Sequence, residues 1–283
     1  MSSKAVTFEF FQLVSPNGAD IGNVFQRLSR SQSTVTYRRY KIRLENYTVD
    51  EDGYHIGTGA LVNAIALPPK AKINNPGIQP LGLADDEGVA SLTSFLFAPE
   101  NNTLVIQRNN NGMRIGSFLH LVQTVTGQTL EANMYLARDT IAKLNRFNSI
   151  TNILLKVVQP RSPEAYEHTS LKSASQMAGD YNAKSITVTL SMGRTRHTHD
   201  ILNNIFAKIR SIPREEQTIE RLVVSGREND DDVLYPLDLL KDRLKVVIDV
   251  SLEDRELKMH SLEEAVKLAY LAKQEDMAYY HAG

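Results

Sequence analysis

The chain has 283 residues, a formal net charge of −1, 42% hydrophobic and 23% charged residues, and no cysteine. This composition is typical of a globular protein with one large domain or two ordinary ones, and the lack of cysteine excludes disulfides and thiolate chemistry. No apolar run approaches the roughly 18 to 20 residues that a membrane-spanning helix needs, so we expect a cytoplasmic protein without direct membrane insertion.

The N-terminal part predicts an antiparallel sheet with helices laid on it. The strand of residues 34–47 has an alternation that shifts between Tyr37 and Tyr40, which indicates a β-bulge. The expected elements are strands at 4–14, 34–47 and 54–67, a helix capped by Asp20 that runs to about Arg30, and a loop rich in Pro and Asn at 68–80.

Residues 80–122 predict a compact unit. An acidic turn, Asp85 to Gly88, leads into an apolar run at 92–98, and a second run at 104–106 follows at hairpin spacing. A polar loop containing Gly112 then precedes an amphipathic helix at 115–125.

The rest of the chain alternates between strands and helices. We place a helical connection at 161–184, between an N-terminal α+β domain at 1–160 and a C-terminal β-α-β-β-α domain at 185–283. The predicted class is therefore α+β, with antiparallel sheets, helices packed on them and two lobes. The expected elements are strands at 130–136, 150–158, 185–191, 218–225 and 245–252, and helices from Asp139, at 164–182, 200–212 and 261–279.

Charge is distributed unevenly along the chain. Residues 228–283 carry 14 Asp and Glu against 7 Lys and Arg, whereas residues 1–227 carry 25 Lys and Arg against 19 Asp and Glu. A basic body with an acidic C-terminal segment is compatible with nucleic-acid binding, although uneven charge is also common on solvated surfaces.

The strand at 34–47 contains a candidate phosphate-binding surface. Tyr37 and Tyr40 are interleaved with Arg38, Arg39, Lys41 and Arg43, as in surfaces that follow a nucleic-acid backbone. We expect Arg38, Arg39 and Lys41 to meet the phosphates. An ordinary basic sheet face would have the same composition.

A second candidate lies at 193–199, before the helix predicted at 200–212. Arg194 and Arg196 stand beside a helix N-terminus, where free N–H groups favour phosphate, although Asp200 as N-cap would compete for them. Arg194 and His199 also have the R-x4-H spacing that resembles toxin-like endoribonucleases of the HEPN type. In those enzymes the pair acts on an RNA 2′-hydroxyl from within a helix, and an ordinary basic loop remains the other alternative.

The sequence gives little support for a metal site or for a known catalytic or nucleotide-binding motif. Asp85-Asp86-Glu87 and Asp230-Asp231-Asp232 are adjacent carboxylates that seldom converge on one ion, and only His197 and His199 are close among the histidines. The chain contains no P-loop, G-x-G-x-x-G, G-x-S-x-G or H-E-x-x-H sequence. We therefore expect no cofactor and no metal, and an enzyme is the less favoured interpretation.

The 80–122 segment resembles the corresponding part of the RexA phage-exclusion family. The shared order is an acidic turn, two strands, a Gly-containing loop and an amphipathic helix, and the helix at 261–279 is similar in kind. The matching features here are Leu83–Glu87, Ser94–Phe97, Thr103–Arg108, Gly112 and Ile115–Leu119.

The resemblance implies a cytoplasmic protein of a prophage or of antiviral defence. Such a protein would bind DNA largely without sequence preference, form a homodimer and have a separate membrane-acting partner. No catalytic residue carries over, and a protein-interaction scaffold without a nucleic-acid role is a further alternative.

The helix at 261–279 independently predicts a homodimer. One apolar stripe is enough to dock this helix on its own sheet, and the remaining apolar side chains could contact a second copy. The docking stripe is Leu262, Ala265, Val266, Ala269 and Ala272, and the surplus is Leu268, Leu271 and Tyr279.

Overall fold

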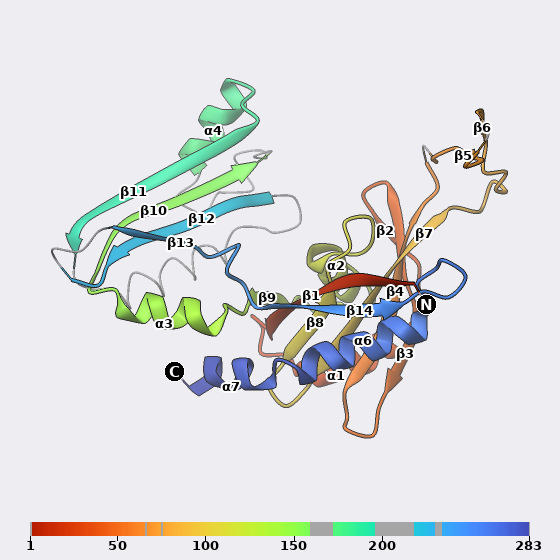
Figure 1. Cartoon of the computed structure of the whole chain (residues 1–283), viewed down its shortest axis with the longest axis horizontal. Helices are drawn as coiled ribbons and strands as arrows, with labels where there is room; N and C mark the ends of the chain where they lie inside the picture. Colours follow the sequence, from red (N-terminus) through yellow and green to blue (C-terminus); the bar gives the residue numbers. More distant parts are fainter. Residues whose placement is uncertain are drawn as a thin grey trace. The chain divides into compact units, whose positions relative to one another are not determined.

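The computed structural model describes residues 2–65, 67–74, 76–158, 172–195, 218–229 and 234–282. Its antiparallel sheets with helices packed on them confirm the predicted α+β class. The chain forms two compact units (Figure 1). The first holds Met1–Ala132 and Lys245–Gln274, and the second holds Asn133–Leu244 and Glu275–Gly283.

The first unit is built on an antiparallel sheet with the strand order β14-β1-β8-β7-β4-β3-β2. The inner strand β8 is buried on both faces, which explains the unbroken apolar run in its middle. The strands are β1 Ser3–Val14, β2 Val35–Tyr37, β3 Tyr40–Val49, β4 His55–Asn63, β7 Val89–Ala98, β8 Thr103–Gln107 and β14 Lys245–Ser251, with β9 Glu131–Met134 paired to β1 off this path.

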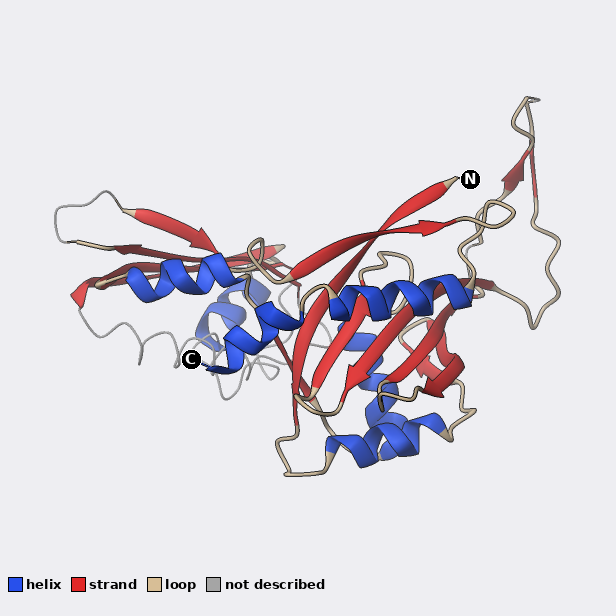
Figure 2. Cartoon of the chain, turned by 60° about the horizontal axis from the view of Figure 1, so that its bottom comes forward, coloured by secondary structure: helices blue, strands red, loops and turns tan. Residues whose placement is uncertain are grey.

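Helices cover both faces of this sheet (Figure 2). On one face, α1 (Ile21–Ser29) stacks Phe25 on Phe97 with ring centroids 4.0 Å apart, beside α2 (Ile115–Thr126). On the other face lies α6 (Met259–Leu271), whose Glu263 contacts Thr58. These faces are opposite because Thr58 pairs with Ser94, and Ser94 and Phe97 have opposite parity in β7.

The connection from β4 to β7 projects beyond the sheet (Figure 1). We call residues 64–88 the arm. Where the sequence predicted a loop, the arm contains a short antiparallel ladder of β5 (Lys70–Ala71) and β6 (Ile78–Gln79).

The second unit contains a four-stranded antiparallel sheet in the order β11-β10-β12-β13. Phe147, Ile153 and Leu222 belong to its buried core, together with Leu144 of α3. The elements are α3 Arg138–Arg146, β10 Ser149–Val158, α4 Lys172–Asp180, β11 Ser185–Thr195, β12 Thr218–Arg227, β13 Tyr235–Asp238 and α7 Gln274–Ala282.

The structure divides the chain differently from the predicted domains. The strand at 149–158, which the prediction placed in the N-terminal domain, pairs with the strands at 185–195 and 218–227. The expected connection at 161–184 therefore lies within one sheet rather than between two domains. The strand at 245–251, expected in the C-terminal domain, pairs with β1 in the first unit. The predicted helix at 200–212 lies outside the described residues.

Two local predictions were also wrong. Residues 34–47 form a hairpin rather than one bulged strand: β2 and β3 pair Tyr37 with Tyr40, and the register shift lies at Leu44/Asn46. The helix at 261–279 is divided into α6 and α7.

Candidate nucleic-acid interface

A cluster of exposed basic residues lies at the tip of the β2–β3 hairpin. Tyr37 and Tyr40 form its last pair, so Arg38 and Arg39 make the turn. Arg38 has a φ of 56°, a left-handed conformation that a tight turn imposes. Both arginines are therefore directed to the end of the sheet and are exposed. We call residues 35–42 the basic hairpin.

Each arginine of the turn is supported by the neighbouring tyrosine. The Arg38 guanidinium lies 5.5 Å from the centre of the Tyr37 ring, and that of Arg39 lies 5.1 Å from the Tyr40 ring. Arg39 Nη2 also donates a hydrogen bond of 2.9 Å to the Tyr40 hydroxyl. Cation–π contacts of this kind hold a guanidinium in place, and the planar charge of a guanidinium suits phosphate oxygens.

The hairpin is held against α2. The Tyr37 ring lies 5.3 Å from the His120 ring, and His120 Nε2 is 3.3 Å from the Thr36 carbonyl oxygen. Across the hairpin, Lys41 Nζ donates to Thr36 Oγ1 at 2.8 Å. These contacts fix the backbone that carries Arg38, Arg39 and Lys41. His120 was missed in the sequence because its partner lies 84 positions away.

Arg43, which also belongs to β3, has an acidic partner beside it. Its Nε lies 2.7 Å from Glu45 Oε1, so its charge is compensated locally. Arg43 is therefore left out of the basic hairpin.

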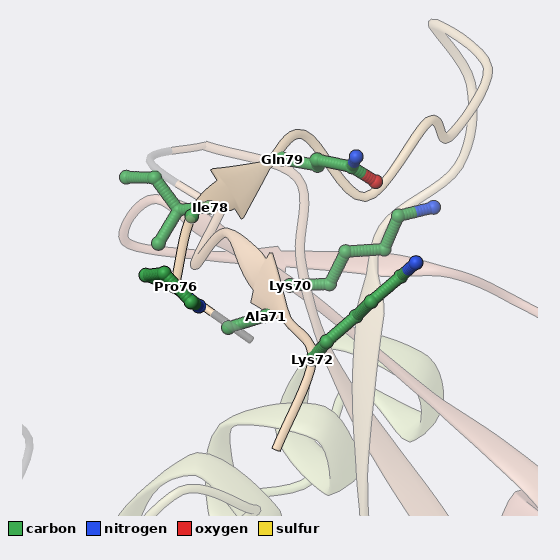
Figure 3. A pocket seen from close by; sticks show the side chains of 7 residues that line it. Lys70, Ala71, Lys72, Pro76, Ile78 and Gln79 are labelled. Atoms are coloured by element: carbon green, nitrogen blue, oxygen red, sulfur yellow. The ribbon is translucent and has the colours of Figure 1, made fainter. Parts of the chain in front are cut away.

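The arm brings further cations to the same end of the sheet. Lys41 pairs with Val62, and the β4 strand runs out one residue later, where the arm begins. Lys70 and Lys72 are both exposed and point to the same side of the arm, away from Pro76 and Ile78 (Figure 3). Sequence inspection placed this segment in a loop, and its only signal was two lysines without a nearby acid.

The second predicted phosphate-binding site, at residues 193–199, begins in the second unit. Arg194 belongs to β11 in the second unit, whereas Arg196 and His199 lie outside the described residues. The R-x4-H pair and the anion site before Asp200 are therefore not part of the described geometry.

No group of three or more His, Cys, Asp or Glu that could hold a metal occurs among the described residues. In the acidic turn, Glu87 is used locally: its Oε2 accepts from the Ala84 N–H at 2.9 Å. Asp230, Asp231 and Asp232 lie outside the described residues. Within the described part of the chain, no helix has the length and apolar character needed to cross a membrane.

A polar seam under α6 was not predicted. Glu263 accepts hydrogen bonds from Asn46 and Thr58. Lys267 bridges two carboxylates, Asp50 at 2.5 Å and Asp52 at 3.0 Å. A sequence signal exists, since the polar residues of α6 recur at helical spacing on the flank of its apolar stripe.

The seam continues at Tyr270, whose hydroxyl donates to Glu100 Oε1 at 2.5 Å. Burial, with that hydrogen bond, raises the pKa of Tyr270. The phenol stays protonated at neutral pH and is 1% exposed, so this part of the seam docks the helix rather than presenting a reactive group.

A second buried pair joins α1 to the sheet. The Tyr47 hydroxyl lies 2.8 Å from His55 Nδ1 and donates to the Phe25 carbonyl oxygen at 3.0 Å. Burial raises the pKa of Tyr47 and lowers that of His55, so both are neutral at pH 7. His55 is 5% exposed and packs against aromatic rings, which makes the pair structural.

Comparison with known proteins gives a family without an assigned activity. DUF6731, described as a family of unknown function, matches residues 1–278, and the chain belongs to this family. No curated protein matches the chain.

Proposed function

We propose that this protein binds DNA through its phosphate backbone, largely without sequence specificity, and that the basic hairpin is the contact surface. The observation that carries the proposal is the tip itself. Residues 35–42 contain three cations and no acidic residue, and Arg38, Arg39 and Lys41 are all exposed. Their backbone is fixed by pairing with β3 and by contact with α2.

The chemistry of the tip suits phosphate. Arginine presents several N–H donors in one plane and binds phosphate oxygens in a bidentate manner, whereas lysine acts as a compact positive charge. Phosphate contacts position a protein on DNA without reading its sequence, and they make the affinity strongly dependent on salt.

The biological setting of the proposal rests on the resemblance of residues 80–122 to the RexA family. On this resemblance we propose a role in phage exclusion or antiviral defence, in the cytoplasm, as a homodimer with a separate membrane-acting partner. The hairpin geometry supports DNA binding independently of this setting.

Fluorescence anisotropy with a random-sequence duplex at several salt concentrations tests the proposal. The variant Arg38→Gln/Arg39→Gln/Lys41→Gln is expected to bind much more weakly. Its plot of log affinity against log salt should be shallower by about 3, because each lost phosphate contact contributes about 0.9 to the slope.

Arg43→Gln is the matched control, since the Arg43 charge is already compensated by Glu45 and should matter little. The proposal is refuted if the wild-type protein fails to bind at about 50 mM salt, a condition that strongly favours phosphate contacts. A salt-independent affinity would refute the phosphate mechanism, and the absence of any binding would favour the scaffold alternative.

A further inference from the structure

The arm exposes apolar side chains at its end. Ile73 is 90% exposed and Ile78 is 73% exposed, and Pro76 lies between them in sequence. Single exposed apolar residues are normal on protein surfaces. Here Ile78 belongs to a short, projecting ladder, in which it pairs with Ala71, and Ile73 and Pro76 lie between the two strands of that ladder in the sequence. Such a concentration of apolar area on a projection indicates a surface that is covered when the protein acts.

The same ladder carries only positive charge. Residues 67–82 include Lys70 and Lys72 and no acidic residue. The two lysines point to one side of the arm, while Pro76 and Ile78 point to the other (Figure 3). The arm therefore has ammonium groups on one side and apolar side chains on the other, and a partner that contacts both must surround the arm, as the walls and floor of a groove do, and offer anions beside an apolar layer.

The arm begins at the end of the sheet where the basic hairpin lies. Lys41 of β3 pairs with Val62 of β4, and Asn63 pairs with Val89 at the point where the arm leaves and returns. The tip arginines follow the Tyr37–Tyr40 pair at that same end. Two basic projections thus arise from neighbouring strands.

We infer that the arm is a second DNA-contacting element, which inserts the apolar side chains Ile73 and Ile78 between base pairs from the minor groove while Lys70 and Lys72 contact the flanking phosphates. Duplex DNA offers what this surface requires, because stacked bases form an apolar layer bordered by phosphates. Minor-groove proteins insert Ile, Leu or Pro between base steps and bend the duplex by doing so. The inference rests on the proposed function and adds the groove, the residues and the bend.

The test measures bending and affinity together, on the full-length protein. A duplex of about 30 base pairs, short against the persistence length of DNA, carries a donor and an acceptor dye at its ends, so that a bend raises energy transfer. Wild type is compared with Ile73→Ser/Ile78→Ser and with Lys70→Gln/Lys72→Gln. Val49→Ser is the control, since Val49 is a 54% exposed apolar residue at the other end of β3.

We expect wild type to bend the duplex and the serine variant to leave it straight. The serine variant should bind about tenfold more weakly, which corresponds to losing the burial of roughly one isoleucine side chain, with an unchanged salt slope. The glutamine variant should lower the salt slope by about 2. Because both isoleucines are exposed, neither variant should change the thermal unfolding curve.

The possible failures are distinct. If the serine variant bends and binds DNA like wild type while the basic-hairpin variant does not bind, the arm inference is overturned and the proposed function stands. If wild type does not bind the duplex, both are overturned. If the serine substitutions instead convert a dimer to a monomer in light scattering, the apolar side joins two copies of the chain and the assignment to DNA is wrong.

Discussion

Glu263 attaches α6 to the sheet, and its replacement by alanine is expected to lower the free energy of unfolding by about 3 kcal/mol. Its carboxylate accepts from Thr58 Oγ1 at 2.8 Å, and both of its oxygens lie 3.0 Å from Asn46 Nδ2. A hydrogen bond to a charged group contributes about 1.5 to 3 kcal/mol. Thr58 is fully buried and would lose its full contribution, whereas Asn46 is half-buried and water can replace part of its bond.

Urea unfolding followed by far-UV circular dichroism measures the change, and amide hydrogen exchange in α6 shows whether the loss arises in the first unit. A double-mutant cycle with Thr58→Val isolates one contact. We expect a coupling energy of about 1 to 2 kcal/mol between Glu263→Ala and Thr58→Val, because the two side chains share a hydrogen bond. Glu263→Gln, which keeps an acceptor oxygen, should cost less than Glu263→Ala.

The reasoning fails if the two substitutions are additive within about 0.3 kcal/mol, the usual limit for independent sites. It also fails if Glu263→Ala leaves the exchange rates of α6 unchanged. Either result would mean that α6 is held on the sheet by its apolar stripe alone.

Two further predictions concern the same helix. Burial opposes ionisation of Asp50, but hydrogen bonds from Lys267 and from backbone N–H groups outweigh burial and lower the pKa of the Asp50 carboxyl. The ionised carboxylate therefore stabilises the fold above the unfolded pKa of about 4, and this contribution is lost as the pH falls through the lower folded pKa. Lys267→Met should therefore cost about 1 kcal/mol at pH 6, with a difference from wild type that shrinks below about pH 4 in parallel urea titrations. Leu268 and Leu271 are 56% and 46% exposed, which leaves them available to a second copy of the chain. If a dimer buries them, the variant Leu268→Glu/Leu271→Glu should be a monomer of about 32 kDa in light scattering. A wild-type protein that is monomeric at micromolar concentration would contradict the predicted dimer.

Elements defined by nearby residues were predictable from the sequence. The acidic turn, the two strands and the helix of residues 80–122 appear as β7, β8 and α2, since hairpin spacing and helical periodicity are both local signals. Within α6, the buried residues Leu262, Ala265, Val266 and Ala269 belong to the predicted docking stripe. The α+β class followed from these elements.

Features that depend on distant pairing were not predictable. The alternation in residues 245–251 identifies a strand, but nothing in it specifies β1 as the neighbour. The seam under α6 likewise joins Glu263 to residues more than 200 positions away. The cations of the basic hairpin were identified in the sequence, but its turn was missed for a local reason. The turn is made of two arginines rather than the Asn-Gly or Asp-Gly pairs typical of such turns, so the shift in alternation indicated a bulge.

The position of the basic hairpin gives its charges a second physical effect that a binding assay must separate. β2 is the last strand of its sheet, and the arginine turn that follows it places positive charge at the end of that edge, where charge opposes pairing with another chain. Removing Arg38, Arg39 and Lys41 can therefore promote association of the protein as well as weaken phosphate binding. The two effects differ in their dependence on salt, because added salt weakens phosphate contacts steeply but leaves backbone pairing between edges largely unaffected. A triple variant that stays at the wild-type mass in light scattering and has a shallower salt slope assigns the charges to DNA, whereas one that aggregates with an unchanged slope assigns them to protection of the edge.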